Sequence, residues 1–180
     1  MQNPFDYTAL RENCCCFTGH RPEALPERGD ETRPGMQMLG DLLESAVSRA
    51  RDEGFTCFFA GGARGFDTLA AEAVLRLGAD DPDVVLCLAL PGRDQAGDWP
   101  EADRTRYDAV LAAAGARVWY AAETCSPASM RRRNRYLVDH ATRCIAYLRR
   151  MRGGTLYTVN YAYDCGVAVE NLAETMDLLG

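Results

Sequence analysis

The sequence predicts an α/β fold, a Rossmann-like three-layer α/β/α sandwich with a mostly parallel sheet. Short apolar runs alternate along the chain with longer stretches of helical periodicity, which is typical of right-handed βαβ crossovers. The run at residues 84–90, VVLCLAL, is apolar throughout, as expected for a strand covered on both faces. Most of the runs end in polar loops that contain glycine. We expect a single nucleotide-binding domain over residues 1–180, with residues 1–13 as an N-terminal arm and the first strand central in the sheet.

A strand, a turn and a helix follow one another in residues 55–77, FTCFFAGGARGFDTLAAEAVLRL. The strand is predicted at 55–60 and the helix at 69–77. The turn between them contains Gly61, Gly62, Gly65, and the capping oxygens of Asp67 and Thr68, with Asp67 as the expected N-cap. Such a turn directs backbone N–H groups and the positive end of a helix dipole at one spot, which favours phosphate and other anions. The alternative is a turn in which glycine only reverses the chain.

The other elements are assigned from the same patterns in chain order. Strands are predicted at residues 14–17, 84–90, 118–120, 143–148 and 167–169. Helices are predicted at 35–53, 101–114, 127–140 and 156–164, with a charged connector at 26–34. Ser126-Pro127 supplies a capping hydroxyl and a proline at the first helical position, and Thr155 is the expected cap of the last helix.

Composition and charge narrow the function classes. The chain is 47% hydrophobic and 26% charged, which is ordinary for a globular protein, and no apolar run approaches the ~20 residues of a membrane helix. We therefore expect no membrane contact and a cytoplasmic location. The net charge of −6 argues against broad nucleic-acid binding. All 20 basic residues are arginine, which excludes a Walker A lysine, a Schiff base and a lysine general base.

The cysteines favour a reduced core over metal or redox chemistry. Of the eight, six fall in predicted strands, where a thiol acts as a small apolar group: Cys14, Cys15, Cys16, Cys57, Cys87 and Cys144. No CxxC motif occurs, and His20 and His140 are the only histidines. The sequence thus predicts no metal site and no required cofactor.

Polar, glycine-containing loops gather at one predicted edge of the sheet. They are TGHRP at 18–22, AGGARGFD at 60–67, PGRD at 91–94 and RRMRGGT at 149–155. Ligands of open parallel sheets bind beyond the carboxyl ends of the strands, where these loops lie. The connections at the opposite edge are plain turns. The loops therefore predict a cleft that binds an anion or a nucleotide.

The candidate ligand-binding residues come mainly from these loops. They are Thr18, Gly19, His20, Arg21, Gly61, Gly62, Ala63, Arg64, Gly65, Asp67, Pro91, Gly92, Asn134, Gly153, Gly154 and Thr155. Arg21 and Arg64 either pair with phosphate oxygens or are solvated surface arginines. Asn134 is an amide in an apolar helical stripe, so it must find hydrogen-bond partners in a neighbouring loop or a ligand.

Two further features of the helix and turn bear on chemistry. Asp67 is the best catalytic candidate, as a carboxylate that accepts a sugar hydroxyl or polarises water. Arg131, Arg132, Arg133 and Arg135 wrap around the predicted 127–140 helix, and as a group they are interpreted as a solvated surface, with room for one of them to turn towards the cleft.

These motifs resemble the SLOG superfamily, and within it the YpsA-like branch. The resemblance rests on TGHRP, on GGARGFDTLAAE, on RxxNxxLVD at 131–139 and on GGT before a helix, and covers roughly residues 14–172. It implies a Rossmann-like fold that binds nucleotides or their derivatives, with ligand contacts at Gly61, Gly62, Gly65 and Asp67 and at residues 153–155. Relatives include LOG phosphoribohydrolases and the DNA-processing protein A family. The LOG stretch PGGxGTxxE corresponds here to RGGTLYTVNYA, which lacks the glutamate.

The leading hypothesis is a cytoplasmic binding or sensor protein for a nucleotide or a nucleotide-derived ligand. Its phosphate is expected on the Gly61–Gly65 turn and Thr155. One alternative is an N-glycosidic hydrolase acting on nucleoside monophosphates, with Asp67 as its carboxylate and Glu72 behind it. Another is an interaction module with a vestigial cleft. A homodimer is compatible with the sequence.

Overall fold

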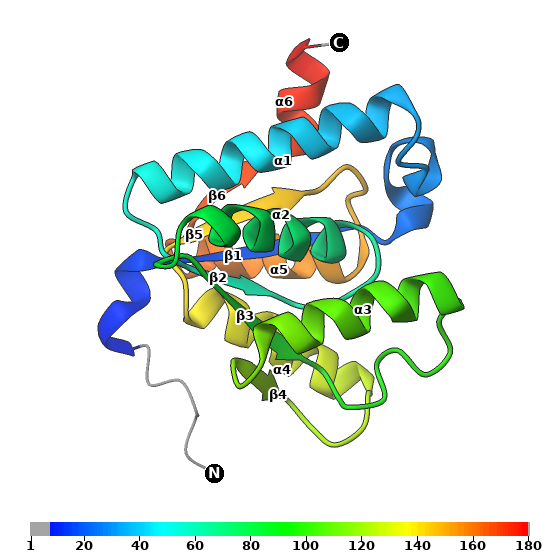
Figure 1. Ribbon diagram of the computed structural model, residues 1–180, viewed down its shortest axis with the longest axis vertical. Helices are drawn as coiled ribbons and strands as arrows, with labels where there is room; N and C mark the ends of the chain where they lie inside the picture. Colours follow the sequence, from blue (N-terminus) through cyan, green and yellow to red (C-terminus); the bar gives the residue numbers. More distant parts are fainter. Residues whose placement is uncertain (1–7, 180) are drawn as a thin grey trace.

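The computed structural model describes residues 8–179, and it confirms the predicted α/β/α sandwich. The strands are β1 (Cys14–Gly19), β2 (Cys57–Ala60), β3 (Val85–Leu90), β4 (Val118–Tyr120), β5 (Arg143–Tyr147) and β6 (Ala168–Asn171). They form a six-stranded sheet in the order β4-β3-β2-β1-β5-β6 (Figure 1). All neighbouring strands are parallel, and β1 lies in the interior, as expected.

Six α-helices cover the two faces of this sheet. They are α1 (Pro34–Asp52), α2 (Phe66–Asp80), α3 (Glu101–Ala114), α4 (Pro127–Asp139), α5 (Gly153–Asp164) and α6 (Leu172–Leu179). α1, α2, α3 and α6 pack on one face, and α4 and α5 on the other (Figure 1). None of these helices, within residues 8–179, is long and apolar enough to cross a membrane.

Three short 3-10 helices complete the described secondary structure: η1 (Thr8–Asn13), η2 (Pro22–Ala24) and η3 (Pro26–Gly29). η1 forms the end of the expected N-terminal arm, whose residues 1–7 lie outside the described part of the chain. η3 lies in the connector predicted at 26–34. Sequence patterns missed α6 altogether, because it is short and follows β6 without an intervening loop.

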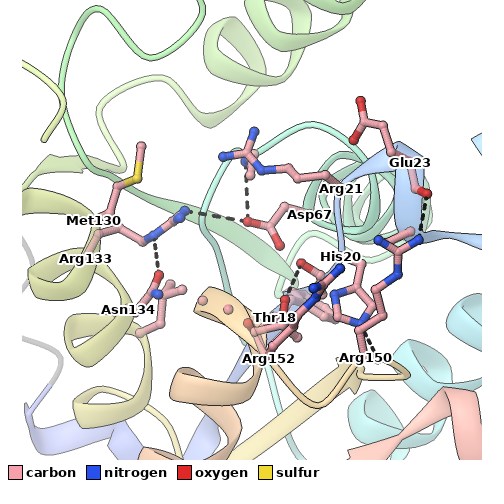
Figure 2. Close-up of a pocket in the computed structure, with 18 residues that line it drawn as sticks. Thr18, His20, Arg21, Glu23, Asp67, Met130, Arg133, Asn134, Arg150 and Arg152 are labelled. Atoms are coloured by element: carbon pink, nitrogen blue, oxygen red, sulfur yellow. Dashed lines mark hydrogen bonds and ion pairs between the residues drawn. The ribbon is translucent and has the colours of Figure 1, made fainter. Parts of the chain in front are cut away.

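The crossover from β4 to β5 creates a switch point in the sheet. The chain runs outward through β2, β3 and β4, and then returns to place β5 on the other side of β1. The connection after β1 therefore leads to α1 on one face, whereas the connection after β5 leads to α5 on the opposite face. A crevice opens where such connections diverge. The side chains in this crevice are shown in Figure 2.

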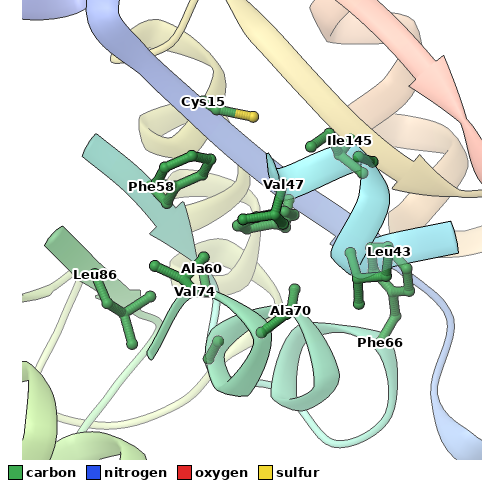
Figure 3. Close-up of a cluster of buried hydrophobic side chains, with 14 of the residues drawn as sticks. Cys15, Leu43, Val47, Phe58, Ala60, Phe66, Ala70, Val74, Leu86 and Ile145 are labelled. Atoms are coloured by element: carbon green, nitrogen blue, oxygen red, sulfur yellow. The ribbon is translucent and has the colours of Figure 1, made fainter. Parts of the chain in front are cut away.

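The core has two apolar layers, because successive strand residues face opposite sides of the sheet. In β1, Cys15 and Phe17 face the α1 and α2 layer, whereas Cys14 and Cys16 face α4 and α5. Figure 3 shows the first layer, where side chains from α1 and α2 meet those of β1, β2, β3 and β5. The prediction of reduced, buried strand cysteines is confirmed.

Two helix starts differ from the sequence-based expectation. α2 begins at Phe66 after an N-cap at Gly65, and α5 begins at Gly153 after an N-cap at Arg152; neither N-cap makes a side-chain capping bond. The expected caps have other partners. Asp67 accepts a hydrogen bond from the backbone N–H of Ala63, and the Thr155 hydroxyl donates to the Gly19 carbonyl at 3.0 Å. Both side-chain oxygens therefore have partners other than the first amides of the helix, one in the preceding turn and one in β1.

Candidate functional site

The crevice at the carboxyl ends of β1 and β5 holds a pocket of about 510 Å³. Four parts of the chain line it: the end of β1 with η2, the start of α2, one face of α4, and the connection from β5 into α5. The lining residues are Phe17, Thr18, Gly19, His20, Arg21, Glu23, Ala24, Ala63, Asp67, Met130, Arg133, Asn134, Leu137, Arg150, Arg152, Gly153, Gly154 and Thr155. Figure 2 shows α4 on one side, with the arginines of the other segments opposite.

The structure brings most of the predicted site residues together. Those that line the pocket are Thr18, Gly19, His20, Arg21, Ala63, Asp67, Asn134, Gly153, Gly154 and Thr155. Those that lie outside its lining are Gly61, Gly62, Arg64, Gly65, Pro91 and Gly92. The predicted cleft therefore centres on β1 and β5, and the turn after β2 contributes through Ala63 and Asp67.

The glycines of the turn after β2 pack closely against protein groups. The Gly61 carbonyl accepts a hydrogen bond from the Arg133 guanidinium, and a Cβ at this position would overlap that side chain. Gly65 has φ +86°, and a Cβ on it would lie 2.6 Å from the His20 carbonyl oxygen. Gly62 has φ +63°, and a Cβ on it would lie 2.5 Å from Leu90 Cδ2. Close packing within the protein explains all three glycines.

Protein contacts also account for the other predicted residues outside the lining. Arg64 Nε lies 2.7 Å from Asp103 Oδ2, in an ion pair on the far side of the turn. Pro91 and Gly92 are buried, and a Cβ on Gly92 would lie 2.6 Å from the backbone nitrogen of Cys125. The loop after β3 is therefore packed against the β4–α4 connection.

A buried ion pair lies at the base of the pocket. Arg133 Nη1 is 3.6 Å from Asp67 Oδ2, and the two residues are 7% and 5% exposed. Burial raises the pKa of the Asp67 carboxyl, and the Arg133 charge opposes that shift. Burial likewise lowers the pKa of Arg133. Arg133 is thus the one arginine of this helix that turns towards the cleft, whereas Arg131, Arg132 and Arg135 are exposed. Its spacing of three residues from Met130 and four from Leu137 was the sequence signal that singled it out.

Arg133 also fixes the orientation of Asn134. Its Nε donates to Asn134 Oδ1 at 2.8 Å, so the acceptor oxygen of the amide is occupied. The Nδ2 group, with two donors, lies 3.8 Å from the position that a Cβ on Gly154 would take, beside the first turn of α5. Asn134 therefore presents hydrogen-bond donors towards the same part of the pocket as the α5 N-terminus.

The pocket contains arginines that have no carboxylate partner. Within residues 8–179, Arg21, Arg150 and Arg152 form no ion pair, although Arg150 donates a hydrogen bond to the Glu23 carbonyl at 3.2 Å. Outside the pocket about half of the arginines are ion-paired, as in Arg49–Glu170 and Arg106–Glu72. Sequence reasoning singled out the 149–155 loop but not Arg150 or Arg152. Positive charge is thus concentrated at the pocket of an acidic protein.

The segment after β5 is attached to the loop after β1 by His20. His20 Nε2 lies 3.0 Å from the backbone nitrogens of both Arg149 and Arg150.

Among residues 8–179 no cluster of His, Cys, Asp or Glu side chains is arranged to hold a metal ion. The polar groups of the pocket are therefore mainly arginine and amide donors, with Asp67, Glu23 and Thr18 as acceptors.

A Rossmann-like parallel sheet with a polar pocket at its switch point places the chain among the doubly wound α/β proteins, in which this edge of the sheet is the usual place for a ligand. The family model described as the YspA SLOG family, YpsA, matches residues 15–166. The chain belongs to this family, as its loop motifs indicated.

Two curated relatives are similar in sequence. UPF0398 protein BH1768 of Halalkalibacterium halodurans is 30% identical over 124 residues, which cover 68% of this chain and 65% of the relative. A UPF0398 protein of Bacillus licheniformis is 27% identical over 147 residues, which cover 81% of this chain and 80% of the relative. The first alignment thus spans less than two thirds of that relative's length.

Two solved structures share the fold. DNA processing protein A from Streptococcus pneumoniae has a TM-score of 0.61 at 20% identity, over 89% of this chain and 50% of that one. DNA processing protein A from Helicobacter pylori has a TM-score of 0.58 at 15% identity, over 87% of this chain and 63% of that one, and its structure concerns a single-stranded DNA binding mode. These likenesses show a common fold.

Proposed function

We propose that this protein binds a nucleotide or nucleotide derivative in the pocket between β1 and β5, with the ligand phosphate at the first turn of α5. The observation that carries the proposal is the set of arginines without carboxylate partners, Arg21, Arg150 and Arg152, facing one pocket. Guanidinium groups and helix N-termini both stabilise phosphate oxygens. The pocket volume is in the range of small-molecule sites.

The first turn of α5 is a better phosphate site than the glycine turn after β2. The N-terminus of α2 is already next to a buried carboxylate, that of Asp67, which would repel an anion. α5 starts with Gly153 and Gly154, has no side-chain cap, and has Arg152 as its N-cap residue. We therefore move the expected phosphate position from the Gly61–Gly65 turn to residues 152–155.

The wall of the pocket formed by α4, opposite the arginines, is suited to the base and sugar of a nucleotide. Met130, which is 38% exposed, and Leu137 offer an apolar surface on α4 against which a base could stack. Asp67 supplies a carboxylate acceptor for a sugar hydroxyl between this wall and the arginines. The spacing of donor, acceptor and apolar groups across the pocket supports a ligand that combines phosphate, sugar and base.

A nucleotide within a single strand of DNA carries the same groups. The Helicobacter pylori neighbour, described with single-stranded DNA, makes this a relevant comparison, although the sequence argued against a nucleic-acid partner. The net charge of −6 favours a small ligand, because strand binding depends on many cationic contacts. A free nucleotide is therefore our first proposal, and binding of an oligonucleotide is tested beside it.

Calorimetry against AMP, ADP-ribose, a dinucleotide and an oligothymidylate tests the proposal. The double variant Arg150→Gln/Arg152→Gln should weaken binding by at least about tenfold, because it removes two charge-assisted contacts. Arg131→Gln, an exposed arginine of α4 outside the pocket lining, is the matched control and should bind like the parent. Absence of binding to every compound contradicts the proposal, and a preference for the oligothymidylate would favour the strand.

A second candidate function is hydrolysis of an N-glycosidic bond in a nucleoside monophosphate. The buried Asp67 carboxylate, which lines the pocket and is oriented by Arg133, favours it, because such a group can stabilise a developing oxocarbenium ion. Base release that is lost in Asp67→Asn would support this activity. Nucleotides that remain intact after long incubation with the parent protein would remove it.

A further inference from the structure

His20 directly follows β1 and is 7% exposed. Its Nε2 atom lies 3.0 Å from the backbone nitrogens of both Arg149 and Arg150. Both backbone groups are donors, so Nε2 accepts both hydrogen bonds, and the proton of the neutral ring is on Nδ1. Figure 2 shows the imidazole beside Arg150, at the edge of the pocket. One ring nitrogen thus joins the loop after β1 to the segment after β5.

The segment held by His20 carries the arginines of the pocket. It starts after Leu148, whose backbone N–H donates to Asn171 Oδ1 at 2.9 Å, and it leads into α5 through a bond from the Arg152 N–H to the Arg150 carbonyl at 2.8 Å. Between these points, the two bonds to His20 are the side-chain contacts that hold the backbone of Arg149 and Arg150. The Arg149 and Arg150 guanidinium groups have partners of their own, Asp177 and the Glu23 carbonyl. His20 therefore acts on the backbone from which the Arg150 and Arg152 side chains extend.

We propose that neutral His20 is a positioning residue, which holds Arg150 and Arg152 in place for anion binding and releases them when it is protonated. The inference rests on the proposed function and adds to it, because it makes anion affinity depend on a residue that acts through the backbone of its neighbours.

The surroundings of the ring keep it neutral near pH 7. Burial, and then the charge of Arg150, lower the pKa of His20. Tyr147 of β5 meets the ring edge-on, with centroids 6.0 Å apart. The charged groups around the pocket and this segment are Arg21, Glu23, Asp67, Arg133, Arg149, Arg150, Arg152 and Asp177, the last being the ion-pair partner of Arg149. A protonated ring has no acceptor, so both backbone bonds are lost.

The direction of the pH dependence separates positioning from simple charge attraction. A positive imidazole that only added charge would strengthen anion binding as the pH falls. A ring that positions the arginines weakens it, because the segment is released. Sulfate is a suitable probe, since it keeps its double negative charge between pH 8 and pH 5.

NMR of the 15N-labelled protein tests the inference between these pH values. At pH 8 the ring nitrogen shifts of His20 should show the Nδ1–H tautomer, and the amides of Arg149 and Arg150 should be protected from hydrogen exchange. As His20 is protonated, this protection should be lost. Sulfate affinity, followed by amide shifts in residues 149–155, should fall by about tenfold, the scale of one or two lost hydrogen bonds.

Two variants isolate the acceptor. His20→Gln retains an oxygen acceptor that does not titrate, so its sulfate affinity should not fall as the pH is lowered from 8 to 5. His20→Phe keeps a ring without an acceptor, so sulfate should bind weakly at both pH values. Circular dichroism melts and the protection of amides in β1 and β5 show whether each variant is folded.

An Nε2–H tautomer at pH 8, protection at Arg149 and Arg150 that survives protonation, or affinity that rises on protonation would each overturn the inference. Failure of sulfate to bind at pH 8, in a protein whose Arg149 and Arg150 amides are protected, would instead overturn the proposed anion site. The two failures are therefore distinguishable.

Discussion

At the scale of single residues, Arg133 connects three separate parts of the site. Its guanidinium donates to the Gly61 carbonyl after β2, lies 3.6 Å from the Asp67 carboxylate of α2, and donates to Asn134 on its own helix. The planar arrangement of its five donors makes this possible, which a lysine could not reproduce. Arg133 therefore sets both the acceptor and the amide donor that face the pocket.

We expect Arg133→Met to lower the free energy of unfolding at pH 7 by about 3 kcal/mol, because it leaves a carboxylate buried without its cation. The loss should be smaller at acid pH. The folded-state pKa of Asp67 is raised, so this carboxyl favours the folded state at low pH and that contribution is lost as the pH rises. Without Arg133 the pKa rises further. Urea unfolding at pH 4.5 and pH 7 measures the difference.

Arg131→Met is the matched control for this prediction. Arg131 is exposed on the same helix, so its substitution should change stability by less than about 0.5 kcal/mol at either pH. An equal loss for Arg133→Met at both pH values would show that the cost comes from packing rather than from the unpaired Asp67 carboxylate.

At the scale of elements, the sequence predicted what local patterns determine. β4 is found at the predicted residues, and β3 and β5 begin or end one residue away, because short continuous apolar runs are a local signal for strands. The N-cap of α4 at Ser126 is also confirmed, with a capping box to Ser129. The starts of α2 and α5 were predicted too late, since Asp67 pairs with Arg133 of α4 and Thr155 donates to the Gly19 carbonyl of β1, contacts that no local pattern shows.

The same limit applies to the site. Residues that follow β1 and β5 could be predicted as pocket residues, because the carboxyl ends of parallel strands share an edge. The strand order was not encoded locally, so no local pattern separated the β1–β5 crevice from the loop after β3, which holds Pro91 and Gly92. The burial of Arg133 depends on that same arrangement.

Gly65 links two elements, and its substitution tests how closely they meet. Gly65→Ala places a Cβ 2.6 Å from the His20 carbonyl oxygen and 2.9 Å from the Arg21 carbonyl carbon, in a backbone with φ +86°. Backbone strain costs about 1 kcal/mol, and the overlap adds about 1–3 kcal/mol. Urea unfolding should therefore show a loss of about 2 kcal/mol or more.

Gly115→Ala provides the comparison for backbone strain alone. Gly115 has φ +59° after α3, and a Cβ there meets no atom within 4 Å. We expect a loss of about 1 kcal/mol for this variant. Equal losses for Gly65→Ala and Gly115→Ala would contradict the close contact between the α2 N-terminus and the loop after β1.

At the scale of the whole molecule, the apolar core and the positively charged pocket lie at different parts of the sheet. The interior of the sheet is closed to solvent on both faces, whereas the carboxyl edge gathers arginines above the β1–β5 crevice. Net negative charge over the remaining surface would direct an anionic ligand away from other sites and leave the pocket as a local region of positive potential. The anion binding that we propose for this pocket would thus depend on the fold as much as on single contacts.

The reactivity of the cysteines measures how well the sheet is shielded from solvent. Cys165 is exposed and Cys125 is partly buried, while Cys14, Cys15, Cys16, Cys57, Cys87 and Cys144 are buried in strands. We expect Cys165 to react rapidly with a thiol reagent in the native protein. Burial, and a hydrogen bond to Asp94, raise the pKa of Cys125 to about 11, so Cys125 should react slowly at pH 8.

Mass spectrometry of a labelling time course, with and without denaturant, measures these rates, and all eight thiols should react once the protein is unfolded. Cys165→Ser should remove the rapid phase and leave the slow one. Rapid labelling of the strand cysteines without denaturant would mean that the sheet opens readily, and the pocket built on its carboxyl edge would then lack the rigid base that anion binding through Arg150 and Arg152 requires.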